Sequence, residues 1–164
     1  MPKHRAIITA SLVLALAVLV PASATAKAGG TDRPVSGKST STTTVDPVAG
    51  TGISDGSGQL SHIGAFTFHN DFTSVTLTSP TTFSFTLTAS VVAANGDLIF
   101  TTATGTGTLT ATGSESTLVS TITGGTGRFA DASGTLTSSI ISVNVSGTPG
   151  TSNDTEIHTG QISY

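Results

Sequence analysis

The stretch Phe83-Ser84-Phe85-Thr86-Leu87-Thr88-Ala89-Ser90-Val91 alternates between apolar and hydroxyl-bearing side chains. Because successive side chains of a β-strand point to opposite faces, this period of two predicts a strand with one apolar and one solvated face. Asn95-Gly96 follows a few residues later and is a strong signal for a two-residue hairpin turn. The next apolar run begins at Leu98, so we expect an antiparallel hairpin here.

Similar patterns continue along most of the chain. Thr, Val, Ile and Phe favour pleated strands, and glycines with small polar neighbours separate the strand-like runs. We expect eight strands, at about 48–54, 60–68, 73–79, 82–93, 97–108, 115–123, 133–146 and 154–164. Short connections favour antiparallel pairing, so the strands either stack as a sandwich or close as a barrel. A barrel of this size is filled by side chains or holds one small ligand.

Two short segments have competing interpretations. The run at 104–108 alternates Thr and Gly, which suits either a flat threonine array or a solvent-facing strand with small partners. No fixed-period repeat continues the run, which favours the second interpretation. His69-Asn70-Asp71 separates two apolar stretches, and because Asn and Asp suit turns we expect a polar turn there.

The N-terminus has the pattern of a secretory signal peptide over residues 1–26. Lys3 and Arg5 precede an apolar run at 7–20, and small residues at 22–26 offer a cleavage site. The apolar run of about 14 residues is short for a membrane span. We therefore expect a secreted, extracellular bacterial protein, with residues 27–47 as a disordered linker and 48–164 as one β-domain.

Charge and cysteine content exclude several classes of partner. The chain has no cysteine, so an exported form must be stable through its core alone. Nine Asp and Glu face six Lys and Arg, and Arg128 is the only basic Lys or Arg after Lys38. An acidic domain without basic clusters is a poor match for nucleic acid or for an anionic membrane surface. We therefore expect neither partner once the signal peptide is removed.

A glycine-rich segment carries a family resemblance. Gly124-Gly125-Thr126-Gly127-Arg128-Phe129, followed by Ala132-Ser133-Gly134, resembles a segment of plant dirigent proteins and is similar to one of allene oxide cyclases. Ser61-His62-Ile63-Gly64-Ala65-Phe66 and Ala94-Asn95-Gly96-Asp97 resemble stretches of secreted bacterial proteins with an allene-oxide-cyclase-like barrel domain. The resemblance implies an eight-stranded, antiparallel, closed β-barrel of calycin-like architecture.

The resemblance also implies a kind of ligand. The plant relatives act on small hydrophobic molecules inside the barrel, by cyclising an epoxide or by steering radical coupling. A small hydrophobic ligand is therefore expected, and any enzymatic activity would be that of an isomerase or cyclase without metal or nucleotide cofactor. A structural or cell-envelope interaction module, using the Thr- and Ser-rich outer face, is a third possibility.

The glycine segment itself has a structural interpretation. Its glycines allow the chain to turn tightly, to seat Phe129 under the end of the barrel and to re-enter the sheet at Ser133. Arg128 is expected to pair with Asp131 or with a carboxylate at a strand end. A phosphate cradle is disfavoured, because no Gly-Lys-Ser/Thr sequence follows. The predicted structural motif comprises Gly124, Gly125, Gly127, Arg128, Phe129, Asp131 and Gly134.

Candidate chemistry lies on two strands. In a regular strand His62 shares a face with Gly64 and Phe66, and an inward histidine is either a general acid or base or a satisfied structural group. On the last strand Glu156, His158 and Tyr164 share one face. If this face points inward, its side chains could polarise an epoxide or carbonyl; in the alternative it points outward and Ile157 points inward. The candidate catalytic residues are His62, His158, Glu156 and Tyr164. The candidate ligand-binding residues are Phe66, Phe68, Phe83, Phe85 and Phe100. The spacing of the candidate catalytic residues along the sequence matches no metal-binding motif, so no metal is expected.

Overall fold

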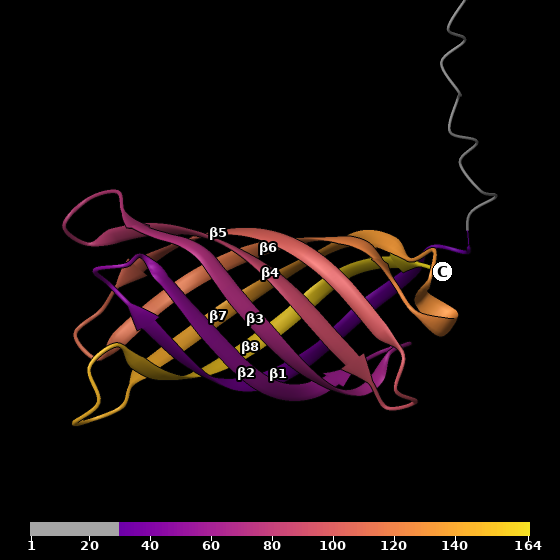
Figure 1. Cartoon of the computed structure of the whole chain (residues 1–164), viewed down its shortest axis with the longest axis horizontal. Helices are drawn as coiled ribbons and strands as arrows, with labels where there is room; N and C mark the ends of the chain where they lie inside the picture. The colour runs from indigo at the N-terminus through magenta and orange to yellow at the C-terminus, as the bar shows by residue number, and fades with distance from the viewer. Residues whose placement is uncertain (1–29) are drawn as a thin grey trace, which may run out of the picture.

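The computed structural model describes residues 30–164, which form a closed antiparallel β-barrel (Figure 1). Each strand pairs with the next along the chain, and the last pairs with the first. The strands are β1 (Arg33–Asp46), β2 (Thr51–Leu60), β3 (Gly64–Leu77), β4 (Thr82–Ala93), β5 (Leu98–Leu109), β6 (Gly113–Gly125), β7 (Ser133–Asn144) and β8 (Thr151–Ser163), with a 3-10 turn η1 (Gly127–Phe129) between β6 and β7. The predicted all-β fold, an eight-stranded antiparallel closed barrel, is confirmed. No helix of the described part is long and apolar enough to cross a membrane.

The N-terminal predictions have a mixed outcome. The expected signal peptide at 1–26 lies outside the described residues. The expectation of a disordered linker at 27–47 is wrong over most of its length, because Arg33–Asp46 is strand β1. β1 bonds to β2 on one side and to β8 on the other, and so closes the barrel. Three of its four buried residues, Ser39, Ser41 and Thr43, are small and polar and only Val35 is hydrophobic, so the hydrophobic signal of the strand is weak.

Strand β3 corrects a second prediction. The two strands expected at 60–68 and 73–79 are one strand, Gly64–Leu77, and the polar turn expected at 69–71 does not exist. Asn70 faces inward and is half-buried, whereas His69 and Asp71 lie on the outer face. His69 Nδ1 lies 2.7 Å from Asp55 Oδ1 and His69 Nε2 lies 3.3 Å from Asp71 Oδ1. These contacts raise the pKa of His69, chiefly through the hydrogen bond to Asp55, and they join β3 to β2.

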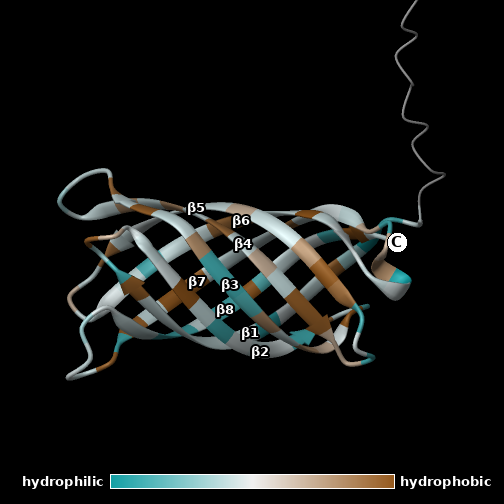
Figure 2. Cartoon of the chain, in the orientation of Figure 1, coloured by the Kyte–Doolittle hydropathy of each residue, from teal (hydrophilic) through white to brown (hydrophobic). Residues whose placement is uncertain are grey.

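The apolar interior is divided along the barrel axis. Figure 2 shows apolar segments alternating with polar ones along the strands, as the pleat requires. One cluster of buried side chains includes Phe66, Phe68, Ile122 and Phe129, and fills one half of the barrel. A second, smaller cluster is formed by Phe85, Leu87, Ala103 and Leu118 in the other half. The two halves therefore differ in how completely they are packed.

The glycine-rich segment closes the filled half, at the end of the barrel where the C-terminus lies (Figure 1). Phe129 is fully buried and its ring lies 4.8 Å from the ring of Tyr164, edge to face. The Arg128 guanidinium stacks over Phe129 and donates to the carbonyl oxygens of Ile63 at 3.1 Å and His62 at 3.4 Å. These contacts tie η1 to the β2–β3 turn, so this end of the barrel is sealed.

Gly127 fixes the local path of this segment. It has a φ of 53°, and a side chain there would collide with the carboxylate of Asp97. That carboxylate, at the start of β5, accepts the backbone N–H of Arg128 at 3.1 Å. The turn therefore needs a glycine both for its backbone conformation and for the space that Asp97 occupies.

Candidate ligand-binding cavity

The opposite half of the barrel is hollow. It contains a cavity of about 410 Å³ that is lined by residues from all eight strands and opens among the turns at the far end from the C-terminus. Cavities of roughly 300–1,000 Å³ typically hold small molecules. The cavity has two chemically different walls, one apolar and one polar, and this division sets what it can bind.

Aromatic side chains of β3 and β4 dominate the apolar wall. The rings of Phe83 and Phe85 are stacked with centroids 5.8 Å apart, and Phe72 lies 5.6 Å from Phe85. Leu118 and Ile140 continue this wall on β6 and β7. Their packing against one another leaves a continuous apolar surface facing the cavity.

Two glycines of β5 keep the cavity open. Gly105 pairs with Phe85 and Gly107 pairs with Phe83 across the β4–β5 ladder. A side chain at either glycine would collide with the facing phenylalanine ring, so both rings lie against bare backbone. Thr104 and Thr106 point outward and are exposed, so the Thr-Gly run is a solvent-facing strand whose small partners accommodate rings inside.

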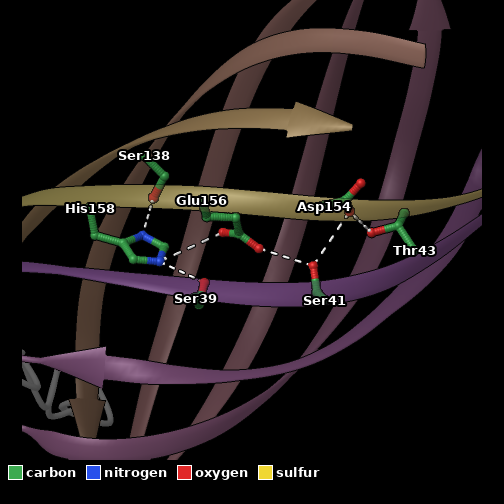
Figure 3. A network of polar contacts seen from close by, with 7 residues as sticks. All are labelled: Ser39, Ser41, Thr43, Ser138, Asp154, Glu156 and His158. Atoms are coloured by element: carbon green, nitrogen blue, oxygen red, sulfur yellow. Dashed lines mark hydrogen bonds and ion pairs between the residues drawn. The ribbon is translucent and has the colours of Figure 1, made fainter. Parts of the chain in front are cut away.

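Strand β8 supplies the charged part of the polar wall. Asp154, Glu156 and His158 all face inward and are buried, whereas Ile157 is 51 % exposed. Figure 3 shows them linked to hydroxyl groups of β1 and β7. The alternative in which the opposite face of β8 points inward is therefore wrong.

Hydroxyl groups hold the two carboxylates. Thr43 Oγ1 donates to Asp154 Oδ2 at 2.5 Å, and Ser152 Oγ donates to Asp154 Oδ1 at 2.8 Å. Ser41 Oγ lies 3.1 Å from Glu156 Oε1 and 3.4 Å from Asp154 Oδ2, so its single proton can serve only one of them at a time. Asp154 is therefore well satisfied, whereas Glu156 has one shared donor.

Burial changes the ionisation of Glu156. Desolvation raises the pKa of Glu156 to about 7, helped by the neighbouring charge of Asp154 and opposed by the hydrogen bond from Ser41. Glu156 lines the cavity, so a carboxyl group that titrates near neutral pH faces its interior. Such a group can hold or release a proton at physiological pH.

His158 is a structural group in this arrangement. Its Nε2 lies 2.8 Å from Ser39 Oγ and its Nδ1 lies 2.7 Å from Ser138 Oγ, so both ring nitrogens are satisfied across β1 and β7. Burial lowers the pKa of His158, which favours the neutral ring. The 3.8 Å contact between His158 Nε2 and Glu156 Oε2 is therefore one between two groups that burial drives towards neutrality, and not a strong ion pair.

Ser54 on β2 completes the polar wall. It is fully buried and lines the cavity, and its hydroxyl has no hydrogen-bond partner. In the strand ladders it lies opposite Thr43 on β1 and Asn70 on β3, both of which also line the cavity. A hydroxyl group buried without a partner costs roughly 1–3 kcal/mol, so this position has an unmet capacity to bind a polar group.

The structure brings together only part of the predicted catalytic set. Glu156 and His158 are neighbours, but His62 and Tyr164 lie at the sealed end, where the Tyr164 hydroxyl donates to the carbonyl oxygen of His62 at 3.0 Å. The predicted inward position of His62 is wrong: it is exposed in the β2–β3 turn with a φ of +66°, outside the strand register. Its imidazole therefore does not reach the cavity.

The predicted ligand-binding phenylalanines also divide. Phe83 and Phe85 line the cavity, whereas Phe66 and Phe68 are packed in the sealed half. The prediction for Phe100 is wrong, because the inward face of β5 begins at Ile99 and leaves Phe100 outward and 40 % exposed.

Of the polar residues that line the cavity, sequence reasoning had found only Glu156. Asp154 shares its face with Glu156, so strand alternation could have found it. Ser54 and Asn70 gave no such signal, because one lies in a strand of glycines and polar residues and the other in an apparent turn. Within residues 30–164 no group of three or more His, Asp and Glu side chains could hold a metal ion.

Known proteins provide no template for this cavity. No family model, no curated protein and no solved structure matches the chain. The resemblance of the glycine segment to allene oxide cyclases and dirigent proteins therefore stays a prediction. The functional assignment rests on the residues that line the cavity.

Proposed function

We propose that this is a secreted binding protein that takes a small, largely apolar molecule into the open half of its barrel. The observation that carries the proposal is the cavity of about 410 Å³ with a continuous aromatic and aliphatic wall. Secretion is supported by the signal-peptide pattern of residues 1–26. The acidic, cysteine-free domain is compatible with a small-molecule ligand.

The physical basis is a cavity that exists before the ligand arrives. Removing apolar surface from water contributes roughly 25 cal/mol per Å². The rings of Phe83 and Phe85 are held back by the backbone of β5, so the ligand need not displace them. The rim of the cavity is also apolar, because Leu77 and Leu109 line it while remaining 65 % and 44 % exposed.

A blocked-cavity variant tests the proposal. Ser142 on β7 lines the cavity, so Ser142→Phe should fill it, whereas Ser139→Phe on the same strand places an equal ring on the outer face. The probe is N-phenyl-1-naphthylamine, which is uncharged at neutral pH and gains fluorescence on leaving water. We expect binding by the unmodified protein and by Ser139→Phe, and its loss in Ser142→Phe. Equal binding by both variants would place the probe elsewhere, and no binding by the unmodified protein would contradict the function.

Glu156 supports a second candidate function, that of an isomerase acting by proton transfer. It faces a mostly apolar cavity, and its pKa of about 7 suits a general acid or base. The reaction class, isomerisation of a hydrophobic oxygenated substrate, comes from the family resemblance. Under this candidate Glu156→Gln abolishes turnover of an epoxide or ketone substrate, whereas His62→Ala has no effect, because that imidazole is outside the cavity. Turnover that survives in Glu156→Gln would exclude the candidate.

A further inference from the structure

The cavity has buried negative charge and no positive charge to balance it. Asp154 and Glu156 are 7 % and 5 % exposed, and neither has a lysine or arginine partner among residues 30–164. The three Lys and Arg side chains of this range are all elsewhere. Arg33 and Arg128 stack on Tyr164 at the sealed end, and Lys38 is exposed on the outside of β1.

Glu156 offers the cavity an oxygen with spare capacity. Its Oε1 accepts from Ser41, but its Oε2 has only the His158 ring at 3.8 Å, which is beyond hydrogen-bond distance. In its ionised form, which predominates above pH 7, Glu156 is purely an acceptor, so the group that satisfies this oxygen must then be a donor. Burying a carboxylate is costly unless it is paired, which favours a donor that also carries positive charge.

Ser54 points to a ligand independently of the carboxylates. It lies on a different strand and lines the same cavity, and its fully buried hydroxyl has no hydrogen-bond partner. The facing residue of β1 is Thr43, whose hydroxyl is bonded to Asp154. The orphan hydroxyl and the acidic pair therefore lie on the same polar wall.

The charged residues lie at the deep end of the cavity. Along β8 the lining residues run from Thr151, next to the β7–β8 turn at the mouth, through Asp154 to Glu156. Leu77 and Leu109 end their strands at the same mouth as Thr151 and give it an apolar rim, away from the charged residues. A ligand that matches this order enters with a polar head first and leaves its apolar body against Phe83 and Phe85.

We infer that the ligand of the proposed binding function is an apolar molecule with a protonated amino group, held by Glu156, Asp154 and the Ser54 hydroxyl. A protonated amine has up to three N–H donors, which matches two carboxylates and one hydroxyl on one wall. A fatty acid or other anion is disfavoured, because its head would place a third negative charge beside the buried pair. The inference depends on the proposed function, since it names the class of ligand for the same cavity.

A head-group series on the unmodified protein tests the inference. Octylamine, 1-octanol and octanoate share one apolar tail, and at pH 8 the amine is still protonated, because alkyl ammonium groups titrate near pH 10. Each compound is titrated against bound N-phenyl-1-naphthylamine. We expect octylamine to bind about tenfold or more tightly than 1-octanol, as charge-assisted hydrogen bonds allow, and octanoate to bind most weakly.

Two variants locate the amine. Glu156→Gln and Ser54→Ala should each reduce the preference for octylamine over 1-octanol, measured as the ratio of the two affinities in the same variant. The matched control is Glu115→Gln, which removes an exposed carboxylate from the outside of β6. Preservation of the preference in Glu156→Gln would overturn the assigned position of the head group.

The outcomes separate the inference from the function on which it rests. If 1-octanol or octanoate binds as tightly as octylamine to the unmodified protein, the inference is wrong and the apolar binding function stands. If neither the fluorescent probe nor any of the three compounds binds, the proposed function itself is wrong. Because this comparison needs no variant, it holds even if a substitution prevents folding.

Discussion

Glu156 is the residue through which pH acts most directly on this barrel. Its pKa is about 7 in the folded protein against an ordinary value near 4.5, so between these values the folded state retains a proton that the unfolded state has lost. The stability contributed by protonated Glu156 is therefore full below pH 4.5 and is lost as pH rises towards 7. His158, whose pKa is lowered, acts in the opposite sense and removes stability as pH falls below about 6.5.

We predict that Glu156→Gln flattens the pH dependence of unfolding. The neutral amide mimics the protonated carboxyl, so the variant should lack the Glu156 contribution, which in the unmodified protein should be a loss of roughly 1 kcal/mol per pH unit or less between pH 5 and 7.5. The measurement is urea unfolding across this range, taken as the difference between the two proteins so that the common contributions of His158 and His69 cancel. Glu115→Gln should follow the unmodified protein. Parallel curves for the unmodified protein and Glu156→Gln would show that Glu156 titrates normally.

At the scale of elements, the width of the cavity depends on what β5 lacks. Gly105 and Gly107 alternate with outward threonines, so the strand keeps its pairing while presenting bare backbone to the rings of β4. The glycines cost conformational entropy, as glycine does in any strand. In return the two glycines leave space, because the rings of Phe83 and Phe85 lie against the backbone of β5 instead of projecting into the cavity.

We predict that Gly105→Ala destabilises the barrel and narrows the cavity together. The added methyl group collides with the ring of Phe85, which must move inward or force the strands apart. Overpacking of this kind typically costs about 1–3 kcal/mol. Chemical denaturation measures the stability, and titration with N-phenyl-1-naphthylamine measures the cavity. Thr106→Ala, which shortens an outward side chain on the same strand, is the control, and unchanged probe affinity in Gly105→Ala would contradict the role of the glycine.

The elements also show how far sequence reasoning reached. β4 was predictable, because its inward face is large and apolar and its outward face carries hydroxyl groups. β1 was not, because three of its four buried residues, Ser39, Ser41 and Thr43, are polar, and Val35 alone gives no hydrophobic period. Asn70 looked like part of a turn because local propensity favours turns there, but the paired strands and the polar cavity accommodate it in β3. The cavity could not be predicted from local patterns either, because it depends on how strands that are distant in sequence close around it.

For the whole molecule, one half of the barrel provides most of the packed core and the other half contains the cavity. The sealed half holds the larger cluster of buried side chains and is fastened by η1, Arg128 and Tyr164. The open half has a smaller cluster and a cavity whose wall includes partly buried aromatic rings. A protein built in this way can be stable while keeping space for a ligand, because the costs of the cavity are confined to one end.

This division predicts opposite effects for two truncations of the same residue type. Phe129→Ala removes a fully buried ring from the sealed half and should cost about 3–5 kcal/mol of unfolding free energy, with probe affinity unchanged at temperatures well below melting. Phe83→Ala removes a half-buried ring that already borders a void, so it should cost about 1 kcal/mol and should weaken probe binding. Urea unfolding and probe titration on both variants test this. If Phe129→Ala lowers the affinity for the probe as much as Phe83→Ala does, the two halves are not independent. Loss of packing at the sealed end would then change the shape of the cavity through the strands that both halves share.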